Sequence, residues 1–239
     1  MTTFDALSAD KLRADLDSAI IGRDIVVLEE TTSTNDSVLE RTSPTTPEGL
    51  VVLAERQVAG RGQRNNSWES ATGRGLWCSI LLRPKIDIGA SPQLAEWAAR
   101  TVADTISKEF ELQATVKLPN DVVVAGKKIA GILVEMRAQK SAPHIAIVGV
   151  GVNVNHRAED FSEELRARAI SLAMALNREI DRHQFTVALL RNLDVSYQEI
   201  FCGGSSSPLL DAKNNAPRCG GAPDLTSSAE RPIHLALLR

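Results

Sequence analysis

Short apolar runs, several of them rich in β-branched residues, recur between residues 25 and 152 with turn residues between them, and they constrain the fold of this chain more than any other feature. Runs of this kind, bounded by polar, glycine or proline residues, are typical of β-strands. The predicted strands cover 25–28, 50–54, 76–82, 115–118, 122–124, 128–136 and 144–152. An Ala-Gly-Lys sequence at 125–127 predicts a tight turn that joins two of these strands directly.

Apolar residues also repeat at helical spacing in several stretches. The strongest pattern opens at Ser91 and Pro92, where the proline suits a first helical turn. Ser33 with Asp36 three residues later resembles a capping-box start for another helix. The predicted helices cover 8–20, about 33–41, 91–106, 171–177 and 182–200. Strands outnumber helices and short turns join several strands, which predicts an α+β domain with a mixed, largely antiparallel sheet and helices packed on one side.

The bulk composition argues against several classes of protein. The chain has 239 residues, enough for one substantial domain and a small second one. Its net charge of −3 argues against a nucleic-acid binder held by a basic surface. No apolar run is long enough to cross a bilayer, and residues 1–10 lack the features of a secretory signal. We therefore expect a cytoplasmic protein without a membrane partner.

The composition of the chain changes near Cys202. Residues 203–208 read Gly-Gly-Ser-Ser-Ser-Pro, which is typical of a linker, and the remaining residues through Arg239 are rich in Gly, Pro, Ser and Ala. We predict a folded domain over 1–201 and an irregular tail over 202–239. The three cysteines are widely spaced and form neither a metal-ligand pattern nor a disulfide framework, so no protein-held metal site is predicted.

A polar loop at 60–68, Gly-Arg-Gly-Gln-Arg-Asn-Asn-Ser-Trp, is the first segment with the chemistry of a ligand site. Glycines permit close approach of the backbone to a ligand, and exposed amides bind oxyanions. Arg61 and Arg64 add charge in a fork that suits phosphate or carboxylate, and Trp68 offers a flat face for a base. The lysine followed by Ser or Thr of a P-loop is missing. A solvated basic loop is the alternative.

Three later segments place lysines or glycines beside predicted strands. Residues 117–121, Lys-Leu-Pro-Asn-Asp, can hold an ammonium at a rigid turn, and a plain β-turn is the alternative. Gly131 within a strand indicates close approach by a ligand or another backbone, and an edge strand protected by lysines is the alternative. The Gly-x-Gly at 149–151 is not a Rossmann fingerprint, because Val154 stands where the third glycine belongs.

The order and spacing of these segments resemble the catalytic domain of the biotin–protein ligases. That family carries Ser-Thr-Asn, Gly-Arg-Gly-(Arg or Gln)-Arg-Gly-x-x-Trp, Lys-Trp-Pro-Asn-Asp, Lys-x-Ala-Gly-Ile-Leu and Gly-x-Gly-x-Asn in this order. The corresponding segments here are 33–35, 60–68, 117–121, 128–133 and 149–153. The resemblance covers about residues 25–200 and implies a class II synthetase-like biotin/lipoate ligase catalytic domain.

The resemblance implies an enzyme that activates biotin with ATP to biotinyl-5′-AMP. It then transfers the biotin to a lysine of a biotin carboxyl-carrier protein, as in acetyl-CoA carboxylase. Mg²⁺ is expected with ATP, held by the phosphates rather than by a protein cage. No enzyme nucleophile is required, and catalysis rests on positioning and on neutralising charge as two anions approach. A homodimer is left open.

The family motifs also imply roles for individual residues. The expected biotin-binding residues are Ser33, Thr34, Asn35, Gln57, Gly60, Arg61, Gly62, Lys117 and Gly131. The expected nucleotide-binding residues are Arg64, Trp68, Asn120, Lys128 and Asn153. Lys117 is expected to bridge the biotin carboxylate and the α-phosphate, and Arg61 is expected to be a second catalytic cation.

The chain departs from the family in three respects. Asn65 and Leu118 stand where the family has glycine and tryptophan. The tail does not resemble the family's small C-terminal β-barrel domain. The N-terminus is also too short for a DNA-binding helix-turn-helix, so no nucleic-acid partner is expected. Two alternatives stay open: a lipoate or octanoate ligase or transferase of the same fold, and a catalytically weakened biotin-binding relic.

Overall fold

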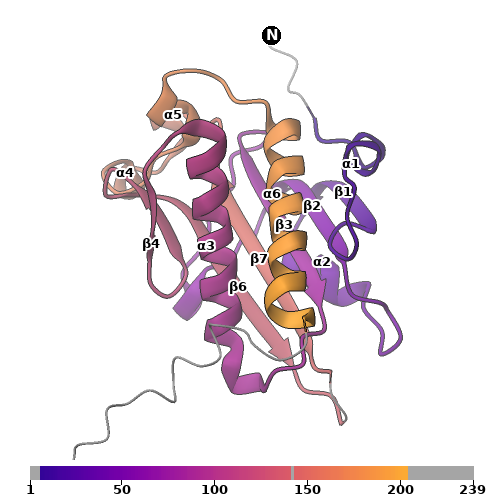
Figure 1. Cartoon of the computed structure of the whole chain (residues 1–239). Coiled ribbons are helices and arrows are strands. Elements are labelled where there is room, and N and C mark those ends of the chain that lie inside the picture. The colour runs from indigo at the N-terminus through magenta and orange to yellow at the C-terminus, as the bar shows by residue number, and fades with distance from the viewer. Residues whose placement is uncertain (1–5, 141–142, 204–239) are drawn as a thin grey trace, which may run out of the picture. The chain divides into compact units, whose positions relative to one another are not determined.

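The computed structural model of the chain describes residues 6–140 and 143–203 (Figure 1). Nearly all of the tail predicted over 202–239 lies outside the described residues. Within them, strands and helices follow one another as in an α+β domain, which confirms the predicted fold class. None of the helices in this part of the chain combines the length and the apolar character that a membrane crossing requires.

Seven strands of the described residues form one mixed sheet in the order β1-β2-β3-β7-β6-β5-β4. The strands are β1 Asp24–Thr31, β2 Leu50–Gln57, β3 Gly75–Leu82, β4 Ala114–Lys117, β5 Asp121–Val124, β6 Lys127–Arg137 and β7 Ile145–Asn153. β1 and β2 run parallel, and every other neighbouring pair is antiparallel. The prediction of a mixed, largely antiparallel sheet is therefore confirmed.

The strand register places several predicted motif segments side by side. Lys117 pairs with Asp121 across β4 and β5, and Asp121 pairs with Gly131 across β5 and β6. Gly131 is in turn opposite Gly151 of β7, which is opposite Trp77 of β3. Segments that are far apart in the chain thus form one continuous row across the sheet.

Two long helices cover one face of this sheet. The helices are α1 Ala9–Asp15, α2 Thr34–Glu40, α3 Ser91–Phe110, α4 Glu163–Arg166, α5 Leu172–Leu176 and α6 Arg182–Tyr197. α3 and α6 lie next to each other in front of the sheet (Figure 1). Their apolar side chains join Cys78, Ile80 and other alternate strand residues in the main core. This layer of α3 and α6 corresponds to the predicted packing of helices on one side of the sheet.

The short helix α2 packs on the opposite face. Its residue Val38 joins Val52 and Leu81 in a second, smaller apolar cluster. Leu81 pairs with Ile147, and two residues away Ser79 pairs with Gly149, so these side chains point to the same face as α2. The glycines of β6 and β7 therefore lie on the face that α2 shares.

The first helix is shorter than the predicted range of 8–20. α1 ends at Asp15, and Leu16 has extended backbone. The buried carboxylate of Asp194, on α6, accepts hydrogen bonds of 2.7–2.9 Å from the three successive backbone N–H groups of residues 19–21. This tertiary contact satisfies the amides outside a helix, so the second half of the prediction is wrong.

Candidate functional site

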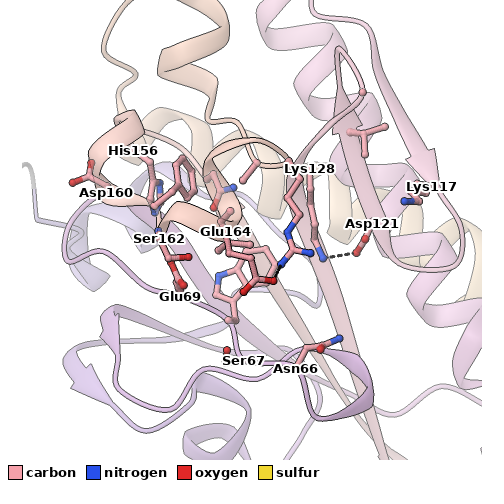
Figure 2. A pocket seen from close by; sticks show the side chains of 18 residues that line it. Asn66, Ser67, Glu69, Lys117, Asp121, Lys128, His156, Asp160, Ser162 and Glu164 are labelled. Atoms are coloured by element: carbon pink, nitrogen blue, oxygen red, sulfur yellow. Dashed lines mark hydrogen bonds and ion pairs between the residues drawn. The ribbon is translucent and has the colours of Figure 1, made fainter.

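Two adjoining cavities open on the face of the sheet that carries the glycines. The larger has a volume of about 530 Å³ and the smaller about 40 Å³. Trp68 borders both of them. Figure 2 shows the larger cavity, with Lys128 linked to Asp121 and with Lys117 at one side.

Neutral polar side chains and one arginine, Arg61, line the smaller cavity. Ser33, Thr34 and Asn35, the residues of the Ser-Thr-Asn motif, are buried at the start of α2. Gln57 Oε1 accepts from the Thr34 backbone N–H at 2.8 Å and from its hydroxyl at 3.2 Å. The hydroxyl of Ser79 lies 2.6 Å from both Thr34 Oγ1 and Asn35 Oδ1. These donors and acceptors suit a neutral polar ring better than a charged group.

Three glycines form the floor between α2 and the loop at 60–68. A Cβ atom added to Gly149 would strike the amide oxygen of Asn35. A Cβ on Gly131 would come within 2.7 Å of the Trp68 ring, and one on Gly151 within 2.8 Å. The close approach expected at Gly131 is therefore present, and in this structure it serves the indole of Trp68.

The loop at 60–68 folds back on itself. The Trp68 N–H donates to the Gly60 carbonyl at 2.8 Å, and the Gly62 N–H donates to the Asn66 carbonyl at 2.7 Å. Gly60 lies so close to Trp68 that an added Cβ would be 2.6 Å from its carbonyl oxygen. Arg64, at the loop tip, has a left-handed φ of 57° and is exposed. Arg64 lines neither cavity, so the structure does not bring this predicted nucleotide-binding residue to the site.

Arg61 lines the smaller cavity, but its guanidinium already donates hydrogen bonds to carboxylates of the protein. It donates to both oxygens of Asp36 at 2.6 and 2.7 Å, and to Glu135 Oε2 at 3.4 Å. The hydrogen bond and charge of Arg61 lower the pKa of Asp36, and the same pair raises the pKa of Arg61. Glu135 Oε2 also accepts from Asn35 Nδ2 at 2.9 Å, which joins the loop to the polar network.

Lys128 lies where the two cavities adjoin. Its Nζ atom is 2.6 Å from Asp121 Oδ1 and 5.2 Å from the centre of the Trp68 ring. Its backbone is held on both sides, because its N–H donates to the Arg168 carbonyl and its carbonyl accepts from Ile170. A Cβ on Gly131 would be 3.2 Å from the ammonium, so Lys128 reaches the glycine floor.

Lys117, predicted at the reacting centre, lines the larger cavity with an exposed side chain. Asn120 Nδ2 donates to the Ile132 carbonyl at 2.9 Å, which fastens the turn after β4 to β6. Asn153 is buried in the wall of the larger cavity, and its Nδ2 donates to the Ile170 carbonyl. In this structure both asparagine amides thus bond to the backbone.

A wall that the sequence did not predict closes the larger cavity. The His156 ring stacks on Phe161 with centroids 5.0 Å apart and meets Trp77 edge-on at 5.6 Å. Burial lowers the pKa of His156 to about 4, so the ring is neutral near pH 7. Glu69 Oε2 accepts from the Ser162 N–H at 3.1 Å, which links the residue after Trp68 to this wall.

The structure brings most of the predicted site residues together. Those lining the two cavities are Ser33, Thr34, Asn35, Gln57, Arg61, Gly62, Trp68, Lys117, Gly131, Lys128 and Asn153. Gly60, Arg64 and Asn120 line neither. Ser79, Asp36 and Glu135 were missed, although a lone serine within the apolar run 76–82 was a usable signal.

Comparisons with known proteins place these features in one family. The model of the biotin/lipoate A/B protein ligase family matches residues 27–153. The "Bifunctional ligase/repressor BirA" of Bacillus spizizenii is 35% identical over 198 residues, covering 83% of this chain and 61% of that protein. The "Biotin--[acetyl-CoA-carboxylase] ligase" of Mycobacterium tuberculosis is 30% identical over 200 residues, covering 77% of this chain and 72% of that protein.

A solved structure agrees with the fold. The biotin protein ligase of Aquifex aeolicus in complex with biotin and ATP superposes with a TM-score of 0.64 at 28% identity. The match covers 74% of this chain and 71% of that one. The predicted biotin/lipoate ligase catalytic fold is thereby confirmed. The chain spans 61% of the length of the ligase/repressor proteins it matches from two Bacillus species.

Proposed function

Because the chain belongs to the biotin/lipoate A/B protein ligase family, we propose that it activates biotin with ATP and transfers it to a lysine of a biotin carboxyl-carrier protein. In the first step a biotin carboxylate oxygen bonds to the α-phosphorus, and the bond from that phosphorus to pyrophosphate breaks. In the second step the carrier amine attacks the acyl carbon of biotinyl-5′-AMP. The amine loses a proton and AMP leaves.

The observation that carries this proposal is the meeting of two unlike cavities at one lysine. The smaller is lined by neutral donors and acceptors from Thr34, Asn35 and Gln57. The larger is lined by the cations Lys117, Lys128 and Arg168, together with the carboxylates of Glu69, Asp121, Asp160 and Glu164. A ligand with a neutral polar ring and a carboxylate suits the first, and a nucleoside triphosphate suits the second. Adenylation needs the two to touch, and Lys128 lies at that junction.

On the biotin side, we assign the ureido group to Ser33, Thr34, Asn35 and Gln57. Ser33, Thr34 and Asn35 are buried and Gln57 is half-buried, so little water competes there, and an incoming ring has to replace hydrogen bonds such as those between Thr34 and Gln57. Gly131 and Gly62 would let the ligand approach the backbone closely. The smaller cavity, at about 40 Å³, is too small for biotin, so Trp68 and its loop have to move when the ligand enters.

On the nucleotide side, we assign the reacting phosphate to Lys128 and the outer phosphates to Lys117. Lys128 is already paired with Asp121, which orients the ammonium and holds it beside the glycine floor. Lys117 is exposed at the open side of the cavity, where an approaching triphosphate would meet it first. Trp68 would flank the adenine, and Asn153 would support the wall behind it.

Mg²⁺ is proposed to arrive with the phosphates of ATP. Within residues 6–140 and 143–203, no group of three or more His, Cys, Asp or Glu side chains could hold a metal by itself. Mg²⁺ often keeps several waters and binds through one or two carboxylates plus substrate phosphates, and that chemistry fits this site. The metal would neutralise charge on the leaving pyrophosphate.

The carrier partner follows from the proposed second step and from the names of the relatives. The carrier lysine has to reach the acyl carbon from the open side of the larger cavity. A cytoplasmic location, a homodimer and the absence of a nucleic-acid partner stay predictions from the sequence. So does the division into a catalytic domain over 1–201 and a tail.

The test is a pyrophosphate-exchange assay with three acids. Biotin is expected to drive the exchange of radiolabelled pyrophosphate into ATP, whereas lipoate and octanoate are not. Exchange with lipoate or octanoate alone would move the substrate to the other branch of the family. Biotin binding without any exchange would select the weakened biotin-binding relic. Labelling of a purified carrier domain by the full chain then tests the transfer step.

A further inference from the structure

Two carboxylates of the protein occupy the fork of Arg61. Asp36, on α2, accepts from two guanidinium nitrogens at 2.6 and 2.7 Å, and Glu135, on β6, accepts at 3.4 Å. A two-point contact fixes the plane of the guanidinium as well as its distance. The side chains of Arg61 and Asp36 are 38% and 36% exposed, so water screens the pair only in part.

The ion pair anchors more than one side chain. Arg61 bridges to Ser67 in the stem of the 60–68 loop, and the Trp68 N–H closes that stem on Gly60. Restraining Arg61 therefore restrains the loop that carries Trp68 over the glycine floor. Asp36 lies directly after Asn35, which lines the smaller cavity. The pair thus spans from one side of the smaller cavity to the other.

The local charge argues against a role of Arg61 on the phosphate. Asp36 and Glu135 both pair with the Arg61 guanidinium, and Arg137 adds a second positive charge near Asp36. An anionic ligand would have to displace Asp36 to gain the same two-point contact. A group that stabilises a transition state needs donors aimed at the place where charge develops. Asp121 accepts from one of the three donors of the Lys128 ammonium, whereas both terminal nitrogens of Arg61 donate to the protein's own carboxylates.

We infer that Asp36 is a positioning residue, which fixes the loop at 60–68 over the smaller cavity by pairing with Arg61. Arg61 then acts through this ion pair and does not contact the phosphate of ATP. This inference rests on the proposed function only for its kinetic readouts. It concerns the same site. It states that Asp36, an acidic residue outside the loop at 60–68, holds that loop in place.

The test compares Asp36→Asn, Arg61→Gln and the double variant. Each single change removes one charged partner of the ion pair. Asp36→Asn keeps the shape of the side chain, whereas Arg61→Gln shortens it and removes the guanidinium. Both are expected to speed amide hydrogen exchange in residues 60–68 about tenfold. Both should raise KM for biotin about three- to tenfold, the factor that corresponds to one lost hydrogen-bonded contact, with kcat within about twofold. The double variant should match either single one, because the two changes remove the same contact.

The opposite pattern would overturn the inference. If Arg61 is a catalytic cation, Arg61→Gln lowers kcat about a hundredfold, and Asp36→Asn leaves loop exchange and KM unchanged. Glu30→Gln is the matched control, since it removes a surface pair of 2.8 Å with Arg56 that lines neither cavity. It should alter none of these quantities, and melting curves confirm that each variant is folded.

The readouts also separate this inference from the proposed function. If the wild-type chain forms no biotinyl-AMP, hydrogen exchange of residues 60–68 and calorimetric biotin binding still compare the variants. Unchanged loop exchange in both single variants would overturn the inference even where the adenylation activity is present. Faster exchange in both would support it even where that activity is absent.

Discussion

The ammonium of Lys128 lies 5.2 Å from the centre of the Trp68 ring and 2.6 Å from the carboxylate of Asp121. The aromatic face and the carboxylate both attract an ammonium, so together they fix its place at the boundary between the two cavities. In the proposed adenylation, a carboxylate and a phosphate that approach each other there would repel. A fixed cation between them would lower that repulsion in the transition state.

We expect Lys128→Met to reduce the rate of biotinyl-AMP formation about a hundredfold. Removing one charge-stabilising contact from a transition state costs about 3 kcal/mol. The fold should persist, because the side chain is 36% exposed. Single-turnover formation of biotinyl-AMP measures the effect.

Lys117→Met removes an ammonium from the same cavity and is the matched comparison. Since Lys117 is exposed at the open side, we expect it mainly to raise KM for ATP. The family motif instead predicts Lys117 at the reacting centre. A hundredfold loss of rate in Lys117→Met with little change in Lys128→Met would support that prediction and reject ours.

Gly151→Ala should disturb the seat of Trp68. The added Cβ would lie 2.8 Å from the indole, so the ring or the strand has to shift. Overpacking of this kind costs about 1–3 kcal/mol. We expect a lower melting temperature, a change in tryptophan fluorescence and weaker binding of both ligands. Gly89→Ala is the control, because nothing lies within 4 Å of the added atom. Equal stability of the two variants would show that Trp68 does not rest on Gly151.

Local patterns were sufficient to predict the strands and the long helices. Each predicted strand between residues 25 and 152 corresponds to one in the structure, because short apolar or β-branched runs bounded by turn residues are typical of strands. The segment 16–20 was predicted wrongly as helix because Asp194, far along the chain, binds the backbone N–H groups there. A contact of this kind leaves no local signal in the sequence.

Site residues that belong to a sequence motif could be predicted. Site residues that only the fold brings to the cavities could not. Strand β3 is buried along its whole length, so no alternation in its sequence reveals that Ser79 faces α2. Asp36 suggested a helix cap, yet Ser33 makes no capping bond and Asp36 pairs with Arg61 instead. The positions of Ser79 and Asp36 in the site depend on which elements lie opposite each other. The fold determines this, and the local sequence does not reveal it.

Ser162→Pro should loosen the wall of the larger cavity. The Ser162 N–H donates to Glu69, and proline removes this donor. The backbone suits proline, since Ser162 has a φ of −57° and the preceding residue is extended. We expect faster hydrogen exchange over residues 158–168 and a KM for ATP about threefold higher, because one exposed hydrogen bond contributes about 0.5–1 kcal/mol. KM for biotin should not change.

Glu69 provides the check on this contact from the acceptor side. Glu69→Gln keeps an acceptor oxygen and should behave like the wild type, whereas Glu69→Ala should match Ser162→Pro. The combination of Glu69→Ala with Ser162→Pro should be no worse than either alone. Additive effects would mean that the two residues act independently and that the wall is held by other contacts.

His156 should make the stability of the domain depend on pH. In the folded state its pKa is about 4, below the usual 6.5, because burial disfavours the imidazolium. As the pH falls from 6.5 to 4, the His156 imidazole binds a proton in the unfolded chain but stays neutral in the folded chain. The free energy of unfolding therefore decreases over this window, by at most about 1.4 kcal/mol per pH unit from this group, and this group adds no pH dependence above it.

His156→Phe should remove that component while keeping the wall intact. A phenyl ring can stack on Phe161 as the imidazole does, and the buried Nδ1 atom has no hydrogen-bond partner among the described residues to lose. Denaturant unfolding at pH 7, 6 and 5 gives the comparison. The wild type should lose more stability than the variant between pH 6 and pH 5. Parallel losses would mean that the His156 imidazole is not buried in the neutral form, and that the wall of the larger cavity is open to solvent.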